Sequence, residues 1–238
     1  MAVAARYVLS MIRAINLTLA QMASRPFRQV FWWSALLSLV TAIAMTMLVS
    51  WLLFSTDMVG SLPWVGSAAE TFADWLGVFA AILLTIILLP AFLGVYASLF
   101  VEKICRAVEQ RYYPELPAAR EQSIGEALWT GIVFGVVFIV ANLIVLPLYL
   151  VPGLNFIIYW LLNGILFGRE YYELVAFRRL PPKTAARLRR QKRTTLFVGG
   201  VVIAIVASIP VVNLLLPLFG TAFMLHIFQS LPVQVSKE

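Results

Sequence analysis

The chain has 238 residues, of which 62% are hydrophobic and only 12% are charged, so we predict an integral membrane protein rather than a globular one. A single cysteine, Cys105, excludes an internal disulfide, and a single histidine, His226, excludes most histidine-based metal and catalytic sites. No polar stretch is long enough to fold alone, so we expect one all-α membrane domain over residues 1–238, without cofactor or metal.

The net charge of +7 is unevenly spread along the chain. All 18 Lys and Arg lie in residues 6–28, 103–120 and 169–193 and at Lys237, whereas the connector 55–74 carries only acids. The positive-inside rule therefore predicts that both termini face the cytoplasm and that the connector lies outside. Nucleic-acid binding is the rival explanation for the basic run 178–193. We predict no such partner, because a basic segment beside a membrane is usually held by topology and anionic lipid.

An amphipathic helix is predicted over residues 4–23. Its apolar positions recur at helical spacing, opposite polar ones: Val8, Ile12, Ile15 and Leu19 against Arg6, Ser10, Arg13 and Asn16. Such a helix lies in the cytoplasmic interface of the membrane, or else packs on another protomer. Arg13 and Asn16 also interrupt the apolar run that a cleavable signal peptide needs.

Two long spanning helices are predicted next, over residues 30–54 and 75–101. The first opens after Ser24 and Pro26, and its uncharged stretch of about 37 Å is enough to cross a hydrocarbon core of about 30 Å. The second is expected to continue into the cytoplasm, where Glu102 and Arg106 stand four residues apart in the order that favours an ion pair. This pair either lies on a solvated helix face or stands at the mouth of a pore.

Two apolar hairpins are predicted over residues 127–168 and 194–229, separated by a basic cytoplasmic segment, 169–193, that forms a loop and a short helix. Pro152, Gly153 and Asn155 break the first hairpin, and Pro210 and Asn213 recur at matching points of the second. Irregular backbone inside a bilayer must be sheltered by protein or must line a water-filled cavity. The two asparagines either line such a pathway or cap the helices that follow them.

The arms of these hairpins are short for a full crossing. The return arm 156–168 and the entry arm 194–209 correspond to about 20 and 24 Å of helix. We therefore expect hairpins that enter and leave by the cytoplasmic face, although six full spans remain the alternative.

The motifs favour transport over catalysis. The chain has no phosphate-binding loop, no zinc motif and no acid within the spans to relay protons, so we expect a passive or weakly coupled pathway. Arginines gather near the predicted inner entrance at positions 25, 28, 106 and 111. Arg28 lies in the first turns of a helix, where the dipole is positive, and together with Arg25 it makes a site for a tetrahedral oxyanion. Alternatively, Arg25 and Arg28 only anchor the chain with its positive side in the cytoplasm.

The order of these features resembles the CysZ sulfate permease family over about residues 5–230. The likeness rests on the amphipathic start, the Pro/Arg turn, the two long spans, Leu-Phe-Val-Glu-Lys at 99–103, Val-Pro-Gly-Leu-Asn at 151–155 and Ile-Pro-Val-Val-Asn at 209–213. The resemblance implies two long transmembrane helices with two half-penetrating hairpins, a homo-oligomer, and sulfate movement across the bacterial inner membrane to supply cysteine synthesis.

The family's sulfate site has a Gly-hydrophobic-Arg-Arg turn before the first long span. The matching positions here are Phe27, Arg28 and Gln29, so Arg28 carries over, while Gln29 replaces the second arginine and the glycine is absent. We hypothesise that Arg25 supplies the missing charge from the other side of Pro26. A non-transporting membrane scaffold or lipid-organising protein is the alternative function, and a membrane-bound enzyme has no motif in its favour.

Overall fold

A computed structural model describes residues 2–55, 67–120 and 123–231. These residues form helices and connecting turns, with no strand among them. They divide into two compact units, one of residues 29–100 and one that combines residues 1–28 with 101–238. Part of the predicted outer connector, residues 56–66 with Asp57, lies outside the described residues, as does Lys237.

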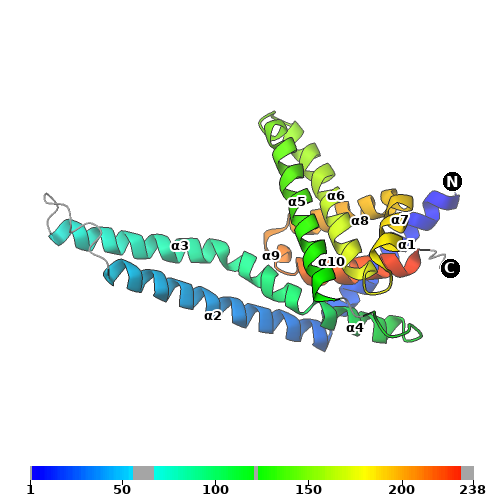
Figure 1. Cartoon of the computed structure of the whole chain (residues 1–238), viewed down its shortest axis with the longest axis horizontal. Helices are drawn as coiled ribbons and strands as arrows, with labels where there is room; N and C mark the ends of the chain where they lie inside the picture. Colours follow the sequence, from blue (N-terminus) through cyan, green and yellow to red (C-terminus); the bar gives the residue numbers. More distant parts are fainter. Residues whose placement is uncertain (1, 56–66, 121–122, 232–238) are drawn as a thin grey trace. The chain divides into compact units, whose positions relative to one another are not determined.

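The first unit is a pair of long helices, α2 (Arg25–Ser55) and α3 (Ser67–Leu99), drawn as neighbours in Figure 1. Small and β-branched side chains are buried at every fourth position of α2, at Val30, Ser34, Ser38 and Ala42. Two hydroxyl contacts join the helices, Thr41 to Tyr96 at 2.5 Å and Thr46 to Thr85 at 3.0 Å. Most of the large apolar side chains of α2 point outward, as expected of a surface that faces lipid rather than water.

The second unit contains the remaining helices. Their bounds are α1 (Ala2–Met22), α4 (Val101–Tyr112), α5 (Ile124–Tyr149), α6 (Leu154–Ala176), α7 (Pro182–Gln191), α8 (Arg193–Ala207), α9 (Pro210–Asn213) and α10 (Leu216–Ser230). Helix α10 is the core of this unit, because every residue from Leu218 to Phe228 is buried. It packs against α1, α4, α6 and α8.

Glycines bring α6 and α8 into very close contact. A Cβ atom added at Gly200 of α8 would lie 1.9 Å from the carbonyl oxygen of Gly164 on α6, and one added at Gly168 would lie 2.4 Å from the carbonyl oxygen of Leu196. Backbone rather than side chain therefore meets backbone at this crossing. Gly164 and Gly168 form a Gly-x-x-x-Gly pair, the pattern that lets helices approach closely in membranes.

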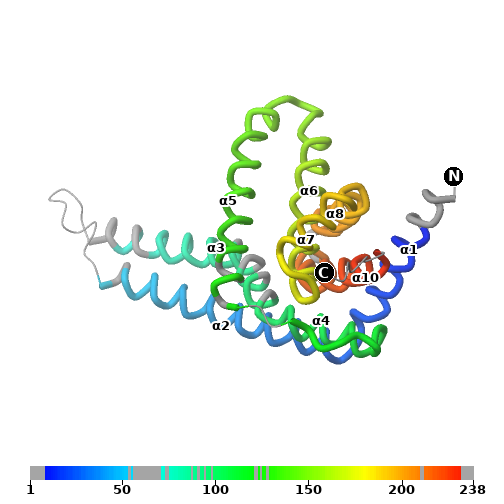
Figure 2. Tube along the Cα trace, turned by 45° about the vertical axis from the view of Figure 1, so that its right-hand side comes forward, coloured from blue at the N-terminus to red at the C-terminus, as the bar shows by residue number. Residues whose placement is uncertain are grey.

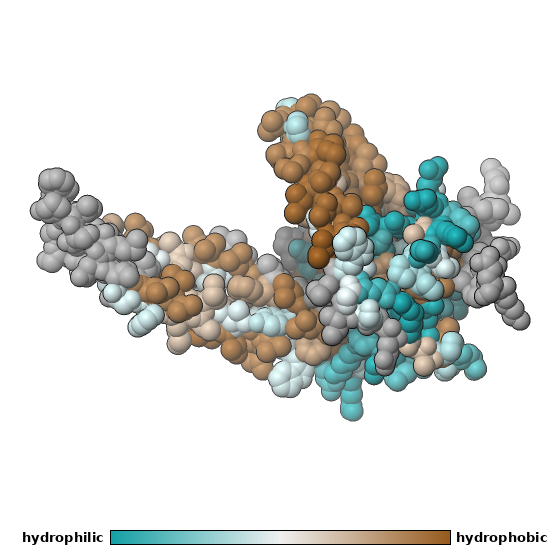
Figure 3. Space-filling view, viewed as in Figure 1, coloured by the Kyte–Doolittle hydropathy of each residue, from teal (hydrophilic) through white to brown (hydrophobic). Residues whose placement is uncertain are grey.

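Helices α5 and α6 form an antiparallel hairpin that Figure 2 shows most clearly. Their turn ends at Gly153, whose φ of +83° is a conformation that residues with a side chain rarely adopt. No side chain from Trp129 to Tyr149 is buried, and the hairpin's surface is brown in the hydropathy view of Figure 3. By length and composition, Arg25–Leu52 and Trp129–Tyr149 are apolar and long enough to cross a membrane, and Trp75–Ile86 and Arg193–Ala207 are shorter apolar stretches.

Several helix boundaries differ from those expected. Helix α3 does not continue into residues 102–110 as expected: it ends at Leu99, Phe100 donates its N–H back to the carbonyl of Ala97 at 3.1 Å, and α4 begins as a separate helix. Helix α6 does not end at Gly168 but runs on to Ala176, so only α7 and its flanking turns form the basic segment.

Helix α1 forms as predicted, but its apolar stripe is mostly turned away from the rest of this unit. Ile12 and Leu19 are exposed and Ile15 is half-buried, while the side chain of Val8 lies outside the described residues. Met11, Ala14 and Thr18 are instead buried in this unit, where α1 packs on α10. The exposed stripe is therefore available to a membrane interface, which stays a prediction.

Candidate functional site

A polar cavity of about 790 Å³ lies between α4 and the turn that joins α6 to α7. We call it the α4–α6 cavity. Its charged lining consists of Glu102, Arg106, Glu109, Arg120, Arg178 and Arg179, and its floor and rim include Gln110, Tyr113, Pro117 and Phe177. All of these residues belong to the second unit.

The two-sided character of α4 positions one wall of this cavity. Ile104, Cys105 and Val108 face the interior and are almost fully buried, and the first four residues of the helix include the exposed Glu102. Glu109 is one position beyond Val108 and is only 9% exposed, so its carboxylate sits at the boundary between the apolar interior and the cavity. A buried carboxylate needs partners, because taking a charge out of water without compensation is costly.

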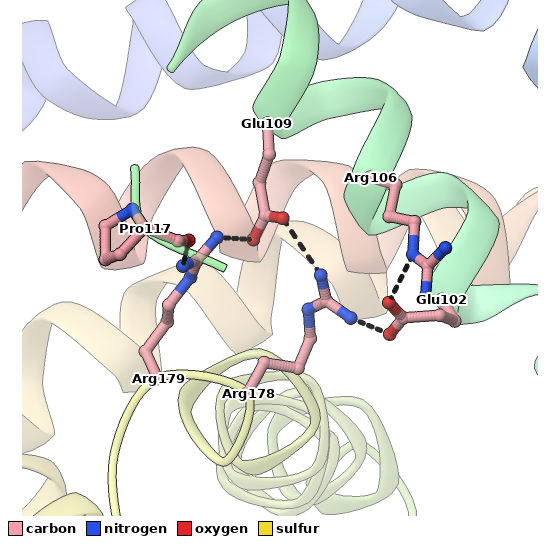
Figure 4. A network of polar contacts seen from close by, with 6 residues as sticks. All are labelled: Glu102, Arg106, Glu109, Pro117, Arg178 and Arg179. Carbon is pink, nitrogen blue, oxygen red and sulfur yellow. Dashed lines mark hydrogen bonds and ion pairs between the residues drawn. The ribbon is translucent and has the colours of Figure 1, made fainter. Parts of the chain in front are cut away.

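Two arginines at the end of α6 supply those partners (Figure 4). Arg178 donates from Nη2 to Glu109 Oε2 at 2.9 Å, and Arg179 pairs from Nη2 with Glu109 Oε1 at 2.7 Å. Arg178 also reaches Glu102 through Nη1, and Arg179 donates to the carbonyl oxygen of Pro117. Residues 102 and 109 lie two helical turns apart on the same face of α4. The two arginines therefore attach the turn after α6 to that face at two points.

Arg120 closes another side of the cavity. Its backbone N–H donates to the carbonyl of Arg178 at 2.8 Å, and its guanidinium grips Glu126 with two bonds of 2.8 and 2.6 Å. Glu126 in turn donates its backbone N–H to the hydroxyl of Ser123, the N-cap of α5, at 3.2 Å. This bidentate pair lowers the pKa of Glu126, chiefly through the hydrogen bond from Arg120.

The cavity carries more positive than negative charge. Four arginines line it, against the carboxylates of Glu102 and Glu109 in the lining and that of Glu126, which pairs with Arg120, so an excess of one positive charge remains. Burial lowers the pKa of Arg178 to about 10, with a further contribution from Arg179, so the guanidinium remains charged at neutral pH. The Nε atoms of Arg178 and Arg179 are buried and have no hydrogen-bond partner among the described residues, so they are not exposed to the cavity. The excess of positive charge in the lining, rather than these atoms, favours an anion.

The same groups are poorly suited to catalysis. Both cavity carboxylates are engaged by arginine, and burial raises the pKa of the Cys105 thiol, which keeps it protonated and unreactive. Within the described ranges, no group of three or more His, Cys, Asp or Glu is placed to hold a metal ion. The arrangement can attract and hold a small anion by charge and hydrogen bonds.

The structure places the predicted oxyanion residues at the start of α2. Arg25 and Arg28 are exposed on either side of Phe27, which is only 1% exposed, and Gln29 is also exposed. The helix begins directly after Ser24, as expected, but the Ser24 hydroxyl makes no hydrogen bond within the described chain. The N–H of Arg28 is already bound to the carbonyl of Ser24 at 3.1 Å, so its guanidinium, not its backbone, is the group available to an anion. None of the three residues lines the α4–α6 cavity.

Of the predicted pore-mouth pair, Arg106 contacts Glu102 at 2.8 Å on the exposed side of α4, and both residues line the α4–α6 cavity. The other charged residues of the cavity are not predicted from the sequence. Two signals were available in the chain: acids seven residues apart in α4, and adjacent arginines directly after an apolar helix.

The two hairpin tips are built differently. Pro152 and Gly153 lie in the turn before α6, and Asn155 accepts a hydrogen bond from the N–H of Phe156 at 2.9 Å in the first turn of that helix. Pro210 instead begins the short helix α9, and Asn213 ends it, exposed and three residues before α10 begins at Leu216. The asparagines therefore do not occupy equivalent positions, and neither is the N-cap residue of the helix that follows.

Comparison with known proteins gives one result. No match was found among curated proteins, and none among solved structures. A family model described as "Sulfate transporter CysZ/Etoposide-induced protein 2.4" matches residues 14–217, which is most of the chain. With its all-helical fold and its long apolar helices, this chain is a membrane protein that belongs to the CysZ/EI24 family of sulfate-transporter-like proteins.

Proposed function

We propose that this protein is a permease or channel for sulfate or a related oxyanion in the bacterial inner membrane, where it supplies sulfate for cysteine synthesis. Membership of a transporter-type family supports this class of function. The observation that carries the proposal is the excess of arginine over carboxylate in the lining of the α4–α6 cavity. The movement is passive or weakly coupled, both termini lie in the cytoplasm, and the working form is a homo-oligomer.

In this proposal the anion meets two groups of arginines. Arg25 and Arg28, with Gln29 beside them, recruit the anion at the start of α2, where the helix dipole adds to their charge. The α4–α6 cavity raises the local anion concentration, and Glu102 and Arg106 stand at its mouth. The hairpin tips at Pro152, Gly153, Asn155, Pro210 and Asn213 line or shape the pathway.

The test of the cavity is sulfate flux in proteoliposomes at low salt. Arg106→Gln removes one exposed charge from the cavity, and Glu102 keeps its contact with Arg178. A unit charge a few ångströms from an ion in an aqueous setting is worth about 1 kcal/mol, so we expect about a fivefold fall in flux. Arg187→Gln is the matched control, because Arg187 is an exposed arginine of α7 that lies outside the cavity lining and outside the predicted inner entrance. Equal flux in the two variants would remove the cavity from the pathway.

The predicted recruiting site is tested separately with Arg28→Ala, with Arg25→Ala as its companion. Sulfate flux should fall strongly in Arg28→Ala, since the site has no second family arginine at Gln29. Wild-type flux in both variants would reject the site while leaving the cavity untested by that result. The alternative of a non-transporting scaffold predicts no flux of sulfate, sulfite or chloride in the wild-type protein.

A further inference from the structure

A second basic pocket lies apart from the α4–α6 cavity, where α6, α7 and α8 meet. Its volume is about 510 Å³, and we call it the α6–α8 pocket. Its lining combines three arginines with apolar side chains: Arg169, Arg189 and Arg193, together with Ile165, Gly168, Thr194, Leu196 and Phe197. No role in the proposed transport pathway uses these residues.

Two of the three arginines of this pocket share a single carboxylate. Arg169 donates from Nε to Glu173 Oε1 at 3.0 Å, and Arg189 of α7 reaches the same oxygen. Arg193, the first residue of α8, is exposed and has no hydrogen-bond or ion-pair partner in the described chain. Three guanidinium groups against one carboxylate leave an excess of two positive charges in the pocket.

The pocket is also fixed in shape. Its base is the crossing of α6 and α8, where Gly168 meets the backbone of Leu196 with no room for a side chain. The Arg169 and Arg189 side chains are half-buried and already held by Glu173, so less side-chain entropy remains to be lost when an anion binds. Such a site is pre-organised for planar, bidentate contacts to a phosphate.

An exposed apolar stripe leads away from the pocket along α6. Leu154, Ile157, Leu161 and Ile165 are all exposed and recur every three or four residues, and Arg169 continues the same face one turn later. From residue 154 to residue 165 the helix rises about 16 Å, close to half of a hydrocarbon core of about 30 Å. Ile165 is 59% exposed and lines the pocket itself, so the apolar stripe and the arginines are continuous.

We infer that the α6–α8 pocket binds the phosphate of an anionic phospholipid headgroup, with an acyl chain lying along the Leu154–Ile165 stripe of α6. A free oxyanion would satisfy the arginines but would leave that stripe without a function. A zwitterionic lipid would cover the stripe but would bring a second positive charge to a pocket that already has an excess of two. Basic pockets between membrane helices recognise anionic headgroups in this way.

Native mass spectrometry of the full-length protein, offered equal amounts of phosphatidylglycerol and phosphatidylcholine in neutral detergent, tests this inference. Wild-type protein should retain phosphatidylglycerol in preference to phosphatidylcholine. Arg193→Glu should lower the retained phosphatidylglycerol about tenfold, because it removes a charge-assisted contact to phosphate and adds a repulsive one. Arg193→Gln gives a milder second variant, and neither change breaks a contact within the described chain.

Arg190→Glu is the matched control, since Arg190 is an exposed arginine three residues away that does not line the pocket. It should leave lipid retention unchanged. An equal loss in Arg190→Glu and Arg193→Glu would reduce the effect to general surface charge and overturn the site. Equal retention of the two lipids by the wild-type protein would also overturn the site. Displacement of phosphatidylglycerol by equimolar glycerol 3-phosphate or sulfate would overturn it as well, because the pocket would then bind a soluble anion. Sulfate flux is a separate readout, so this inference stands or fails independently of transport.

Discussion

The crossing of α6 and α8 offers the sharpest test of the fold. In Gly200→Ala the new Cβ would lie 1.9 Å from the Gly164 carbonyl oxygen and 2.5 Å from the Gly168 nitrogen. Real Cβ atoms essentially never approach closer than 3.0 Å, and the atoms in the way are backbone, which cannot move aside by changing a rotamer. The two helices must separate by about 1 Å along much of their contact, so we expect a loss of about 3 kcal/mol, at the upper end for overpacking.

The matched control is Gly131→Ala on α5, where a Cβ meets nothing within 4 Å. Alanine is the better helix former by about 1 kcal/mol, so this variant should be neutral or slightly more stable. Thermal unfolding in detergent, monitored by size-exclusion chromatography, measures the stability of both variants. For a chain of this size we expect Tm to fall by about 6–12 °C in Gly200→Ala and not at all in Gly131→Ala. Equal melting of the two variants would refute the close crossing.

Three further predictions concern individual side chains. Cys105 is fully buried and burial raises the pKa of its thiol, so maleimide should react with wild-type protein only after the protein unfolds. The cysteine of Gly153→Cys, at the exposed hairpin turn, should react at once in the folded protein. Fast labelling of folded wild-type protein would contradict the burial of Cys105 in α4. Glu109→Gln leaves Arg178 and Arg179 facing a neutral amide and should lower the free energy of unfolding by about 3–5 kcal/mol. Glu102→Gln, at the exposed end of the network, should lower it much less. Similar Tm values for the two variants would count against a buried ion pair at Glu109. The hydrogen bond from Arg120 lowers the pKa of Glu126 in the folded state, so the stability that the ion pair contributes is present above the ordinary pKa of 4.5 and is lost as pH falls through the lowered pKa. The Tm difference between wild type and Glu126→Gln should therefore be present at pH 7 and shrink as pH falls below 4.5. A Tm difference that does not change with pH would reject the ion pair.

Much of the helical outline could be predicted from the sequence, because apolar periodicity and prolines are local signals. The start of α2 after Ser24, the short basic helix α7 and the turn at Gly153 all follow from such signals. The family resemblance is confirmed by the match over residues 14–217. Whether the hairpins half-penetrate the membrane stays a prediction, since helix length does not place a bilayer.

The packing within the second unit could not be predicted in the same way. Hydropathy alone does not distinguish α10, which is buried on all sides, from α5, which is apolar and exposed, because lipid and protein interior select the same residues. The α4–α6 cavity was missed because Glu109 and Arg178 are 69 residues apart and each reads locally as a surface charge. The Gly-x-x-x-Gly pair at 164 and 168 was a local signal of the helix crossing that the sequence analysis did not use.

The two predicted hairpins are therefore not two copies of one structural unit. Helix α5 has 26 residues, about 39 Å, and none of its side chains between Trp129 and Tyr149 is buried, so within this unit it is anchored mainly by α6 and by the Arg120–Glu126 pair at its start. Helix α8 has only 15 residues, and its partner α10 is enclosed by four other helices. One hairpin thus presents a long apolar surface to its surroundings, whereas the other forms the core against which the charged helices α4 and α7 pack.

Lipid or a second copy of the chain must cover the first hairpin, because about 20 consecutive apolar residues are not stable in water. The surroundings of α5 and the core around α10 then have separate tasks: the former sets how the protein sits in a membrane or an oligomer, and the latter holds the arginines of the α4–α6 cavity at fixed distances from one another.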